Sequence, residues 1–492
     1  AKKTTSARAL SEGTTVQAVV MYAYNDEHKC TEEQATVTVK QGTSVLKEYM
    51  QVTAYNYNAS GNVVRKETYV VGEEQSTGKA IEETVYDEKG NKKKSYTYNS
   101  LDASSKFYTE SEYAENGQVL AEYDETGENK TEYEYIDGTN VVRGQKLPNG
   151  SRFAYGHDAD DTVTSITQST AEGEENSTRT RYTCGEVTEL VSGNNVVRYA
   201  YDKKRRVSKV DLNGTENYIL NTYTDGSSSE IMRIQYVPRG TDADEGKADV
   251  FEITKNKRGD ITNVKYGYTN APESAVLEEL YSYEYDEKFR VKRIKKGSAE
   301  LESMTYDTLD RQTAHMFGGN THTAEYDAYG KKSKESLLFQ NETTPLVYTY
   351  TYKENAAGTL EKLEVGSFVE RYEKDSLGRT KKTEHTLGGN RYSQQYGYYK
   401  QGDHATTRVN TVYYNKNGVS DGKVTYTYDA MGHVTAVNEN GQQRYVYEYD
   451  KIGRLISEKD LYKDKEVCYT YDNNGNILTK DVNGERTEYR YQ

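Results

Sequence analysis

The chain has 492 residues, of which 49 are tyrosine and four are proline, and it carries a formal net charge of −14 at pH 7. This acidic balance excludes nucleic acid as the expected partner, because a phosphate-binding face needs clustered lysine and arginine. No apolar run approaches the roughly 18 residues that a membrane-spanning helix needs. The three cysteines, Cys30, Cys184 and Cys468, lie too far apart in sequence to indicate a disulfide scaffold.

The low aliphatic content would ordinarily indicate a disordered chain, but the tyrosines argue against disorder. They alternate with polar residues, as in 348–352 and 445–449, which places every ring on one face of a β-strand. A buried tyrosine contributes a large apolar surface when its hydroxyl finds a partner. The composition therefore predicts an all-β protein, a long antiparallel ribbon with a thin aromatic layer and under about a tenth helix.

Residues 1–50 contain two strand-like runs, 16–24 and 35–39, but no Tyr-Asp pair followed by a turn glycine. This N-terminal β segment has two interpretations, a distinct cap or a set of decayed repeats, and the sequence does not separate them. From residue 51 to residue 492 no proline-rich or serine-rich linker divides the chain. We therefore predict one continuous repeat array over 51–492 rather than a string of domains.

A five-residue pattern, Tyr-Asp-x-x-Gly, recurs through this array. Aspartate at the first position of a four-residue turn accepts hydrogen bonds from backbone amides, and glycine at the fourth position adopts a positive φ without a steric penalty. The pattern predicts tight turns between strands, with a structural rather than a catalytic role. The assigned turn residues are Asp87 and Gly90, Asp124 and Gly127, Asp327 and Gly330, Asp429 and Gly432, Asp450 and Gly453, and Asp472 and Gly475.

Weaker copies of the pattern lack the glycine. The Tyr-Asp pairs at 201–202, 285–286 and 306–307 lead to Arg205, Phe289 and Asp310 instead. In the last third of the chain the full pattern recurs about every 21 residues. A second turn signal, Asn-Gly, closes units of this kind at 213–214, 440–441 and 483–484. One repeat is therefore predicted to be one β-hairpin.

The sequence shows no group of residues suited to catalysis, to a cofactor or to a metal ion. The seven histidines form no His-Glu-x-x-His motif, and no Gly-x-Ser-x-Gly elbow is present. His315 and His322 flank a short turn, but no third ligand lies nearby in sequence. The aspartates in 158–161 do not match a calcium-binding EF-hand loop. We expect no cofactor, no bound metal and no enzymatic activity.

The unit at 447–454, Tyr-Glu-Tyr-Asp-Lys-Ile-Gly-Arg, resembles the YD repeat of the Rhs family, which also occurs in bacterial insecticidal toxin complexes and in animal teneurins. The resemblance covers most of the chain after residue 55. It implies a ribbon of hairpins wound as a continuous spiral into a hollow shell, which in the toxin members encloses a C-terminal toxic polypeptide. The sequence departs from that pattern because it stops inside a repeat, without the family's self-cleaving segment. The array is therefore expected to be truncated at its C-terminal end.

Two functions from different classes are consistent with these features. In the first, the protein is a non-catalytic bacterial shell, secreted or exposed on the cell surface, that carries or encloses a toxin or effector polypeptide. In the second, it is a cell-surface adhesin or fibre-like protein whose tyrosine rows bind an extracellular protein or glycan. Both place the protein outside the cell, without a nucleic-acid partner or a transmembrane segment in this chain. The unpaired ends of such an array also allow oligomerisation.

Overall fold

The computed structural model of the chain describes residues 2–11, 13–169, 175–183, 185–192, 195–212, 217–223, 231–237, 247–271, 274–356, 358–472 and 475–490. The secondary structure is 68% strand and 1% helix, which confirms the prediction of an all-β chain with under about a tenth helix. The described helix, α1 (Glu74–Thr77), is a single turn between two strands. No helix among the described residues is long and apolar enough to cross a membrane.

The strands, in chain order, are β1 (Lys2–Thr4), β2 (Arg8–Ser11), β3 (Thr14–Tyr24), β4 (Cys30–Gln41), β5 (Ser44–Tyr57), β6 (Val63–Val70), β7 (Ala80–Tyr86), β8 (Lys92–Asn99), β9 (Asp102–Tyr113), β10 (Val119–Tyr123), β11 (Lys130–Tyr135), β12 (Val142–Lys146), β13 (Arg152–His157), β14 (Val163–Ser169), β15 (Glu175–Thr183), β16 (Glu186–Ser192), β17 (Asn195–Tyr201), β18 (Val207–Leu212), β19 (Asn217–Tyr223), β20 (Ile231–Val237), β21 (Ala248–Lys255), β22 (Ile261–Thr269), β23 (Glu278–Tyr285), β24 (Val291–Lys296), β25 (Ala299–Tyr306), β26 (Gln312–Phe317), β27 (Asn320–Tyr326), β28 (Lys332–Leu338), β29 (Leu346–Tyr352), β30 (Leu360–Val365), β31 (Phe368–Lys374), β32 (Thr380–Leu387), β33 (Asn390–Gln401), β34 (His404–Lys416), β35 (Val419–Tyr428), β36 (Val434–Glu439), β37 (Gln442–Tyr449), β38 (Leu455–Asp460), β39 (Lys465–Tyr471), β40 (Ile477–Val482) and β41 (Glu485–Glu488).

The sheet has the simplest possible connectivity. Every strand from β3 to β40 pairs antiparallel with the strand that follows it in sequence. At the N-terminal end, β1 and β2 both pair with β3. The chain is therefore one uninterrupted ribbon of hairpins.

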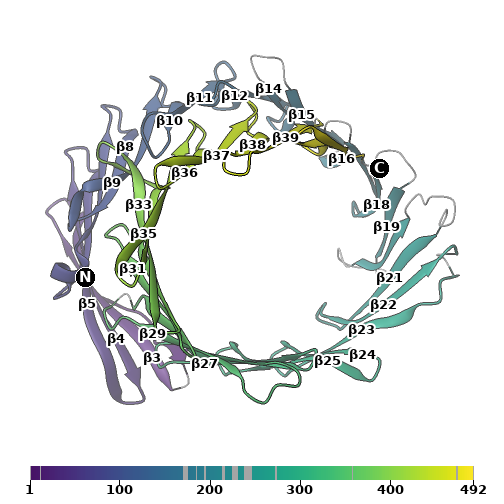
Figure 1. The fold of residues 1–492 in the computed structure, drawn as a ribbon, viewed down its shortest axis with the longest axis horizontal. Coiled ribbons are helices and arrows are strands. Elements are labelled where there is room, and N and C mark those ends of the chain that lie inside the picture. The colour runs from purple at the N-terminus through teal and green to yellow at the C-terminus, as the bar shows by residue number, and fades with distance from the viewer. Residues whose placement is uncertain are drawn as a thin grey trace.

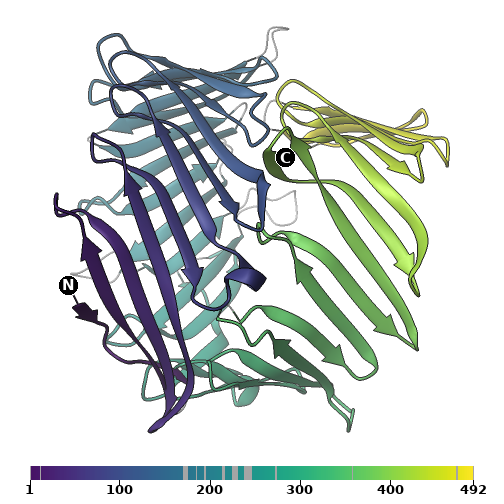
Figure 2. The same ribbon diagram turned by 90° about the vertical axis from the view of Figure 1, so that its left-hand side faces the viewer.

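This ribbon winds around a wide central space for more than one turn (Figure 1). The strands from β27 onward return to the region of β3–β16, and Figure 2 shows that this second pass is displaced along the axis of the ring rather than superimposed on the first. The right-handed twist between neighbouring strands accumulates along an antiparallel sheet, so a long ribbon tends to curl. The predicted continuous spiral of hairpins, wound as a shell, is confirmed.

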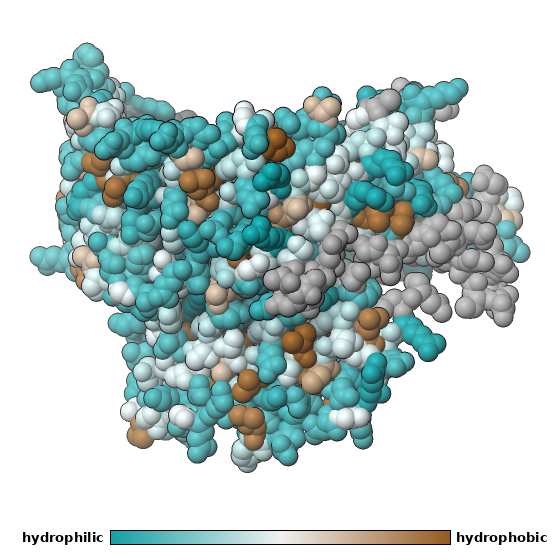
Figure 3. Space-filling model, turned by 90° about the horizontal axis from the view of Figure 1, so that it is seen from above, coloured by the Kyte–Doolittle hydropathy of each residue, from teal (hydrophilic) through white to brown (hydrophobic). Residues whose placement is uncertain are grey.

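The wall of the shell is thin. The protein exposes 29465 Å² of accessible surface, whereas a compact protein of its mass, 55.9 kDa, would expose about 18,000 Å². The largest fully buried side chains among the described residues are two valines, two threonines and a serine. Figure 3 shows a mainly hydrophilic surface on which apolar residues are scattered. One sheet with two solvated faces explains both the large surface and the small core.

Each Tyr-Asp turn is held by its aspartate. At 450–454 the Asp450 amide donates to the Arg454 carbonyl at 2.8 Å, and the Gly453 amide donates back to the Asp450 carbonyl at 3.0 Å. Carboxylate atom Oδ1 of Asp450 accepts the amides of Ile452 and Arg454 at 3.1 and 2.8 Å, and Oδ2 accepts the Arg454 guanidinium at 2.6 Å. The pairing register shifts just before the aspartate, which is a β-bulge of the kind that accompanies three-residue hairpin loops.

The tyrosine before each aspartate joins one hairpin to the previous one. The Tyr449 hydroxyl donates to the Val434 carbonyl at 3.0 Å, and the Arg454 guanidinium lies 4.9 Å from the ring centre of Tyr471 in the next hairpin. Tyr471 has both kinds of contact, because its hydroxyl donates to the Leu455 carbonyl at 2.6 Å. Its ring therefore has a polar partner at its tip and a cation over its face. Equivalent hydroxyl-to-carbonyl bonds are made by Tyr57, Tyr86, Tyr135, Tyr201, Tyr285, Tyr306, Tyr352, Tyr398, Tyr428 and Tyr471.

All six assigned glycines occupy the fourth position of such turns. Their φ angles lie between 72° and 90°, and each amide donates to the carbonyl of its aspartate at 3.0–3.1 Å. The copies without glycine keep the same turn and place Arg205, Phe289 and Asp310 at φ of 62°, 64° and 66°. The Asn-Gly turns at 440–441 and 483–484 have positive φ at both residues, whereas 213–214 lies outside the described residues.

The sheet has no break at residue 50, because β5 runs across that position. Residues 1–50 also contain one turn of the same kind. The Asn25 amide donates to the Lys29 carbonyl, the Asn25 side chain accepts the amides of Glu27 and Lys29, and His28 has a φ of 62°. This turn therefore has the same hydrogen bonds as the turns of the repeat array.

Candidate functional site: the seam between the two turns

The second turn of the spiral contacts the first along a line that we call the seam. Side-chain hydrogen bonds across it join residues between 273 and 317 positions apart in sequence. On the first turn these contacts extend from Leu10 to Asn149, and on the second from Arg311 to Lys451. The seam is what turns an open spiral ribbon into a closed wall.

The hairpin of β33 and β34 makes the central contact. These strands have 12 and 13 residues, and their tip reaches the edge of β9 on the first turn. His404 pairs with Lys106 in the one parallel pairing found among the described strands, and the Lys106 amide donates to the Asp403 carbonyl at 2.9 Å. Here the backbone of one turn continues the sheet of the other.

Side chains reinforce this backbone contact. The His404 ring stacks on Tyr108, with ring centres 3.8 Å apart and planes at 14°. The Tyr108 hydroxyl donates to the Asp403 carboxylate at 2.5 Å, and the Lys106 ammonium lies 3.9 Å from the same carboxylate. The bond from Tyr108 lowers the pKa of Asp403, whereas burial and that bond raise the pKa of Tyr108. The proton therefore stays on the tyrosine and the negative charge on the aspartate.

A partly buried ion cluster lies beside the hairpin tip. Arg408, whose side chain is 18% exposed, approaches Asp124 at 3.0 Å and Glu125 at 3.1 Å. The Thr407 amide and hydroxyl also donate to the Glu125 carboxylate. Burial alone would raise the pKa of Asp124, but hydrogen bonds from the turn, chiefly from Thr126, and the charge of Arg408 lower it. One guanidinium thus bridges two carboxylates across the seam and offsets part of their negative charge.

The first and second turns of the spiral pack closely at the tip of the β33–β34 hairpin. Thr126, Ala405 and Thr406 are 3%, 1% and 0% exposed. A Cβ atom on Gly127 would lie 2.5 Å from the His404 ring. Gly127 therefore meets two requirements, a positive φ of 72° in its turn and the close approach of the neighbouring turn of the shell.

The seam has a second close contact at its N-terminal end. The Arg311 guanidinium donates to the Leu10 carbonyl at 3.0 Å, and the Ser11 hydroxyl donates to the Ala328 carbonyl at 3.3 Å. A Cβ atom on Gly330 would lie 2.3 Å from the Leu10 carbonyl oxygen. Other hydrogen bonds across the seam join Lys47 to the carbonyls of Glu354 and Asn355, Glu73 to the amide of Ala356, Lys400 to Ser105, Gln401 to Glu128, and Asn149 to the carbonyl of Lys451.

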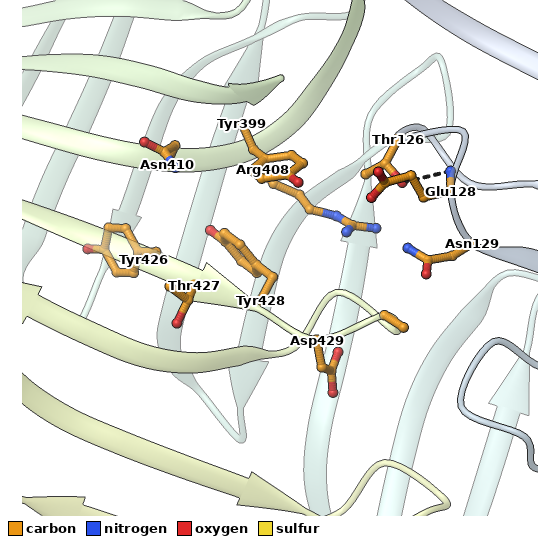
Figure 4. A pocket seen from close by; sticks show the side chains of 11 residues that line it. Thr126, Glu128, Asn129, Tyr399, Arg408, Asn410, Tyr426, Thr427, Tyr428 and Asp429 are labelled. Atoms are coloured by element: carbon orange, nitrogen blue, oxygen red, sulfur yellow. Dashed lines mark hydrogen bonds between the residues drawn. The ribbon is translucent and has the colours of Figure 1, made fainter. Parts of the chain in front are cut away.

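A cavity of about 330 Å³ opens between the first and second turns of the spiral, next to the ion cluster of Arg408, Asp124 and Glu125 (Figure 4). One side is formed by the loop between β10 and β11, on the first turn of the spiral. The other side is formed by β33, β34, β35 and the loop after β35, on the second turn of the spiral. Thr126, Glu128 and Asn129 line the first side, and Tyr399, Arg408, Asn410, Tyr426, Thr427, Tyr428, Asp429 and Ala430 line the second. The cavity is therefore complete only when the seam is formed.

The structure brings some of the predicted turn residues to the seam and leaves others away from it. Asp124 and Gly127 contact the second turn, Gly330 lies against Leu10, and Asp429 lines the cavity. The turn at 450–453 takes part through the Lys451 carbonyl. The remaining assigned residues of these turns, Asp87, Gly90, Asp327, Gly432, Asp450, Gly453, Asp472 and Gly475, serve their own hairpins.

Sequence reasoning missed the central residues Tyr108, Asp403, His404 and Arg408. The stretch between Gly378 and Asp429 lacks a Tyr-Asp pair, but the longer stretch 203–284 lacks one as well. An interruption of the repeat therefore does not single out the residues of the seam.

The two groups considered as metal ligands have other partners. His315 and His322 are direct cross-strand neighbours, and they contact Glu302 at 2.9 Å and Glu335 at 3.1 Å. The segment 158–161 is another hairpin turn, in which the Asp158 carboxylate accepts two backbone amides. The described residues contain no group of three or more potential ligands placed to hold a metal ion.

No protein-family model matches the chain, and no curated protein matches it in sequence. Its fold is similar to that in the crystal structure of TcdB2-TccC3, with a TM-score of 0.51 and 13% identity over 95% of this chain and 27% of that one. The crystal structure of TcdB2-TccC3-TEV matches 97% of this chain and 31% of its own, with 12% identity and a TM-score of 0.46. The chain thus spans less than a third of the length of these two structures.

Proposed function

We propose that this protein is a non-catalytic wall, a shell of β-hairpins that encloses or carries another polypeptide. The observation that carries this proposal is the seam: hydrogen bonds, an ion cluster and a backbone pairing close the ribbon around a central space (Figure 1). A ribbon that served only as an extended binding surface would gain nothing from contacts between its turns. Closure serves a protein that separates an inside from an outside.

The enclosed polypeptide is a toxin or effector, and the shell acts outside the bacterial cell. This part of the proposal is supported by the resemblance of 447–454 to the YD repeat of the Rhs family, whose members include toxin carriers. The similarity of fold to TcdB2-TccC3 agrees with it. Fold alone does not determine function, so the nature of the enclosed polypeptide needs its own test.

A structural role without catalysis is supported by the way charged groups are used. At the seam, Arg408 is engaged by Asp124 and Glu125, and Asp403 by Tyr108 and Lys106. In the repeats, Asp450 is engaged by Arg454 and two amides. Carboxylates held in this way are poor general bases, because their charge is already stabilised by their partners.

Adhesion through rows of exposed tyrosines gains less support. Most tyrosines that precede the turn aspartates direct their hydroxyls at carbonyls of the neighbouring hairpin, as Tyr449 does to Val434, and Tyr123 directs its hydroxyl at the Glu112 carboxylate. The described tyrosines with the most exposed side chains are spread along the chain from Tyr24 to Tyr489. The rings therefore pack the wall rather than line one continuous binding surface.

Cryo-electron microscopy of the natural gene product, with whatever sequence flanks residues 1–492, tests the proposal. We expect a ring with additional density inside it, and the isolated chain 1–492 is the matched control, for which we expect the same ring without that density. An empty ring in the natural product, or a second polypeptide bound on the outer face, would overturn the proposed function. Absence of a ring in both samples would overturn the fold instead.

A further inference from the structure

The cavity at the seam has the size of a small-molecule site. Its volume, about 330 Å³, lies at the lower limit of the range found for ligand pockets, roughly 300–1,000 Å³. It suits a single six-membered ring with its substituents rather than a nucleotide or a folded peptide segment. Because its walls come from two turns of the shell, any occupant contacts both (Figure 4).

The charged groups around the cavity already have partners. Arg408 is paired with Asp124 and Glu125. Asp429 accepts two backbone amides and contacts the His433 ring at 3.0 Å. Glu128 accepts a hydrogen bond from Gln401. An ionic ligand would have to displace one of these partners, so the lining favours a neutral one.

Three neutral polar groups in the lining have spare hydrogen-bonding capacity. Within the part of the chain that the structure describes, neither the Tyr399 hydroxyl nor the Tyr426 hydroxyl makes a hydrogen bond. The Asn410 side chain uses only its oxygen, which accepts the Thr411 hydroxyl at 2.8 Å. These groups lie on three neighbouring strands, β33, β34 and β35, and all three residues line the cavity (Figure 4). They offer two hydroxyls, one amide nitrogen and two aromatic faces.

We propose that the seam cavity binds a small neutral polyhydroxy molecule of about the size of one monosaccharide. Hydroxyl groups of such a ligand bond to Tyr399, Tyr426 and Asn410, and its apolar C–H face packs against a tyrosine ring. The bound molecule bridges the β10–β11 turn and β33–β35, so it stabilises the seam by its binding free energy. This binding goes beyond the proposed function and holds whatever the shell encloses.

Ligand-observed NMR and calorimetry on the chain 1–492 test the proposal, with D-glucose, D-galactose, N-acetyl-D-glucosamine and myo-inositol as probes. We expect at least one probe to bind saturably with a Kd of about 0.1–10 mM and to raise the thermal midpoint. Failure of all four to bind at up to about 50 mM would overturn the proposal.

Variants that remove single polar groups locate the site. Tyr426→Phe keeps the ring and removes the hydroxyl, so we expect binding about two- to tenfold weaker, and a similar loss for Asn410→Ala. Tyr469→Phe is the matched control, because Tyr469 holds the same position in a hairpin that does not line the cavity. Unchanged affinity in the double variant Tyr399→Phe/Tyr426→Phe, with an unchanged hydrogen-exchange pattern, would exclude this cavity as the site.

Discussion

The turn at 450–454 and the seam at β9 and β34 show two ways in which this protein uses aspartate and tyrosine side chains. In the turn, Asp450 finds its partners within four residues, and Tyr449 reaches a carbonyl 15 residues away. At the seam, Tyr108 and Asp403 meet across 295 residues. The ribbon is therefore stabilised locally, hairpin by hairpin, whereas its closure depends on contacts between distant segments.

This difference predicts an order of folding. Hairpins bring together residues close in sequence and form early, whereas the seam needs a loop of several hundred residues to close and forms after the ribbon has curled. In repeat arrays each unit is stabilised mainly by its neighbours. A substitution in one hairpin turn should therefore destabilise mainly that hairpin. A substitution at the seam should instead separate the first and second turns of the spiral.

Acid should have the largest effect, because it acts on the turns and the seam together. In the hairpin turns, the side chain four residues after the aspartate and the backbone amides of the turn donate hydrogen bonds to the aspartate carboxylate. These bonds lower the pKa of Asp87, Asp202 and Asp286. Each of these aspartates has a lower pKa in the folded chain than in the unfolded chain, where its pKa is about 4, so it stabilises the fold when the pH is above about 4. This contribution is lost as the pH falls below about 4.

Alkali should act through the tyrosines. Burial raises the pKa of Tyr426 and Tyr449, so the stability that these residues contribute is present below about pH 10 and is lost as pH rises further. Thermal midpoints measured between about pH 3 and pH 11 should show a plateau that falls at both ends. A midpoint that rises on acidification below about pH 4 would contradict the turn geometry.

Gly330→Ala should separate the two regions most sharply among single substitutions. The new Cβ is strained at a φ of 78° and also meets the Leu10 carbonyl across the seam, so we expect a loss of about 2–5 kcal/mol. Gly90→Ala is the control, since Gly90 has a φ of 87° but its nearest neighbour would be 3.8 Å away. It should cost about 1–2 kcal/mol. Equal losses, measured by native-state hydrogen exchange, would show that residues 10 and 330 do not meet.

Asp450→Ala should damage the ribbon without opening the seam. The Asp450 side chain is 6% exposed and satisfies two amides and one guanidinium. Its removal leaves these donors unpaired, at a cost of about 2–3 kcal/mol. Lys451→Ala in the same turn should change stability by less than about 0.5 kcal/mol. Hydrogen exchange should accelerate in β37 and β38 but not in β9, and acceleration in β9 would contradict local stabilisation.

Asp161→Gly should have the smallest effect and the opposite sign. Asp161 occupies the position that glycine holds in the complete turns and has a φ of 60°. Glycine accepts this conformation without strain, so we expect a gain of about 0.5–1 kcal/mol in that hairpin. Slower exchange of the β13 and β14 amides would show the gain. A loss of protection there would mean that the turn at 158–161 differs from the others.

The sequence predicts the ribbon well because its determinants are local. Alternating tyrosines set the strands, and aspartate and glycine set the turns, each within a few residues. Prediction is weaker where another residue takes the glycine position, as Asp161 does, and 158–161 was considered only as a calcium-binding loop. The turn geometry there is fixed by Asp158 rather than by glycine.

The seam could not be predicted in the same way. Which hairpins meet depends on the twist and curl accumulated over many strands, and no single stretch of sequence encodes that sum. Arg408 and Asp124 each look like an ordinary surface charge until the second turn brings them together at 3.0 Å. The tip of the β33–β34 hairpin, at 401–404, has no Tyr-Asp pair and gave no signal of its own.

The most direct test of the account is a disulfide across the seam. Lys106 and His404 are partners on adjacent strands, which lie about 5 Å apart and so within the range that a disulfide bridges. In a chain whose three native cysteines are replaced by serine, Lys106→Cys/His404→Cys should form an intramolecular disulfide under mild oxidation, identified by peptide mapping. The account predicts this link in the monomer and none in either single variant. Free thiols in the folded double variant would show that the first and second turns do not meet.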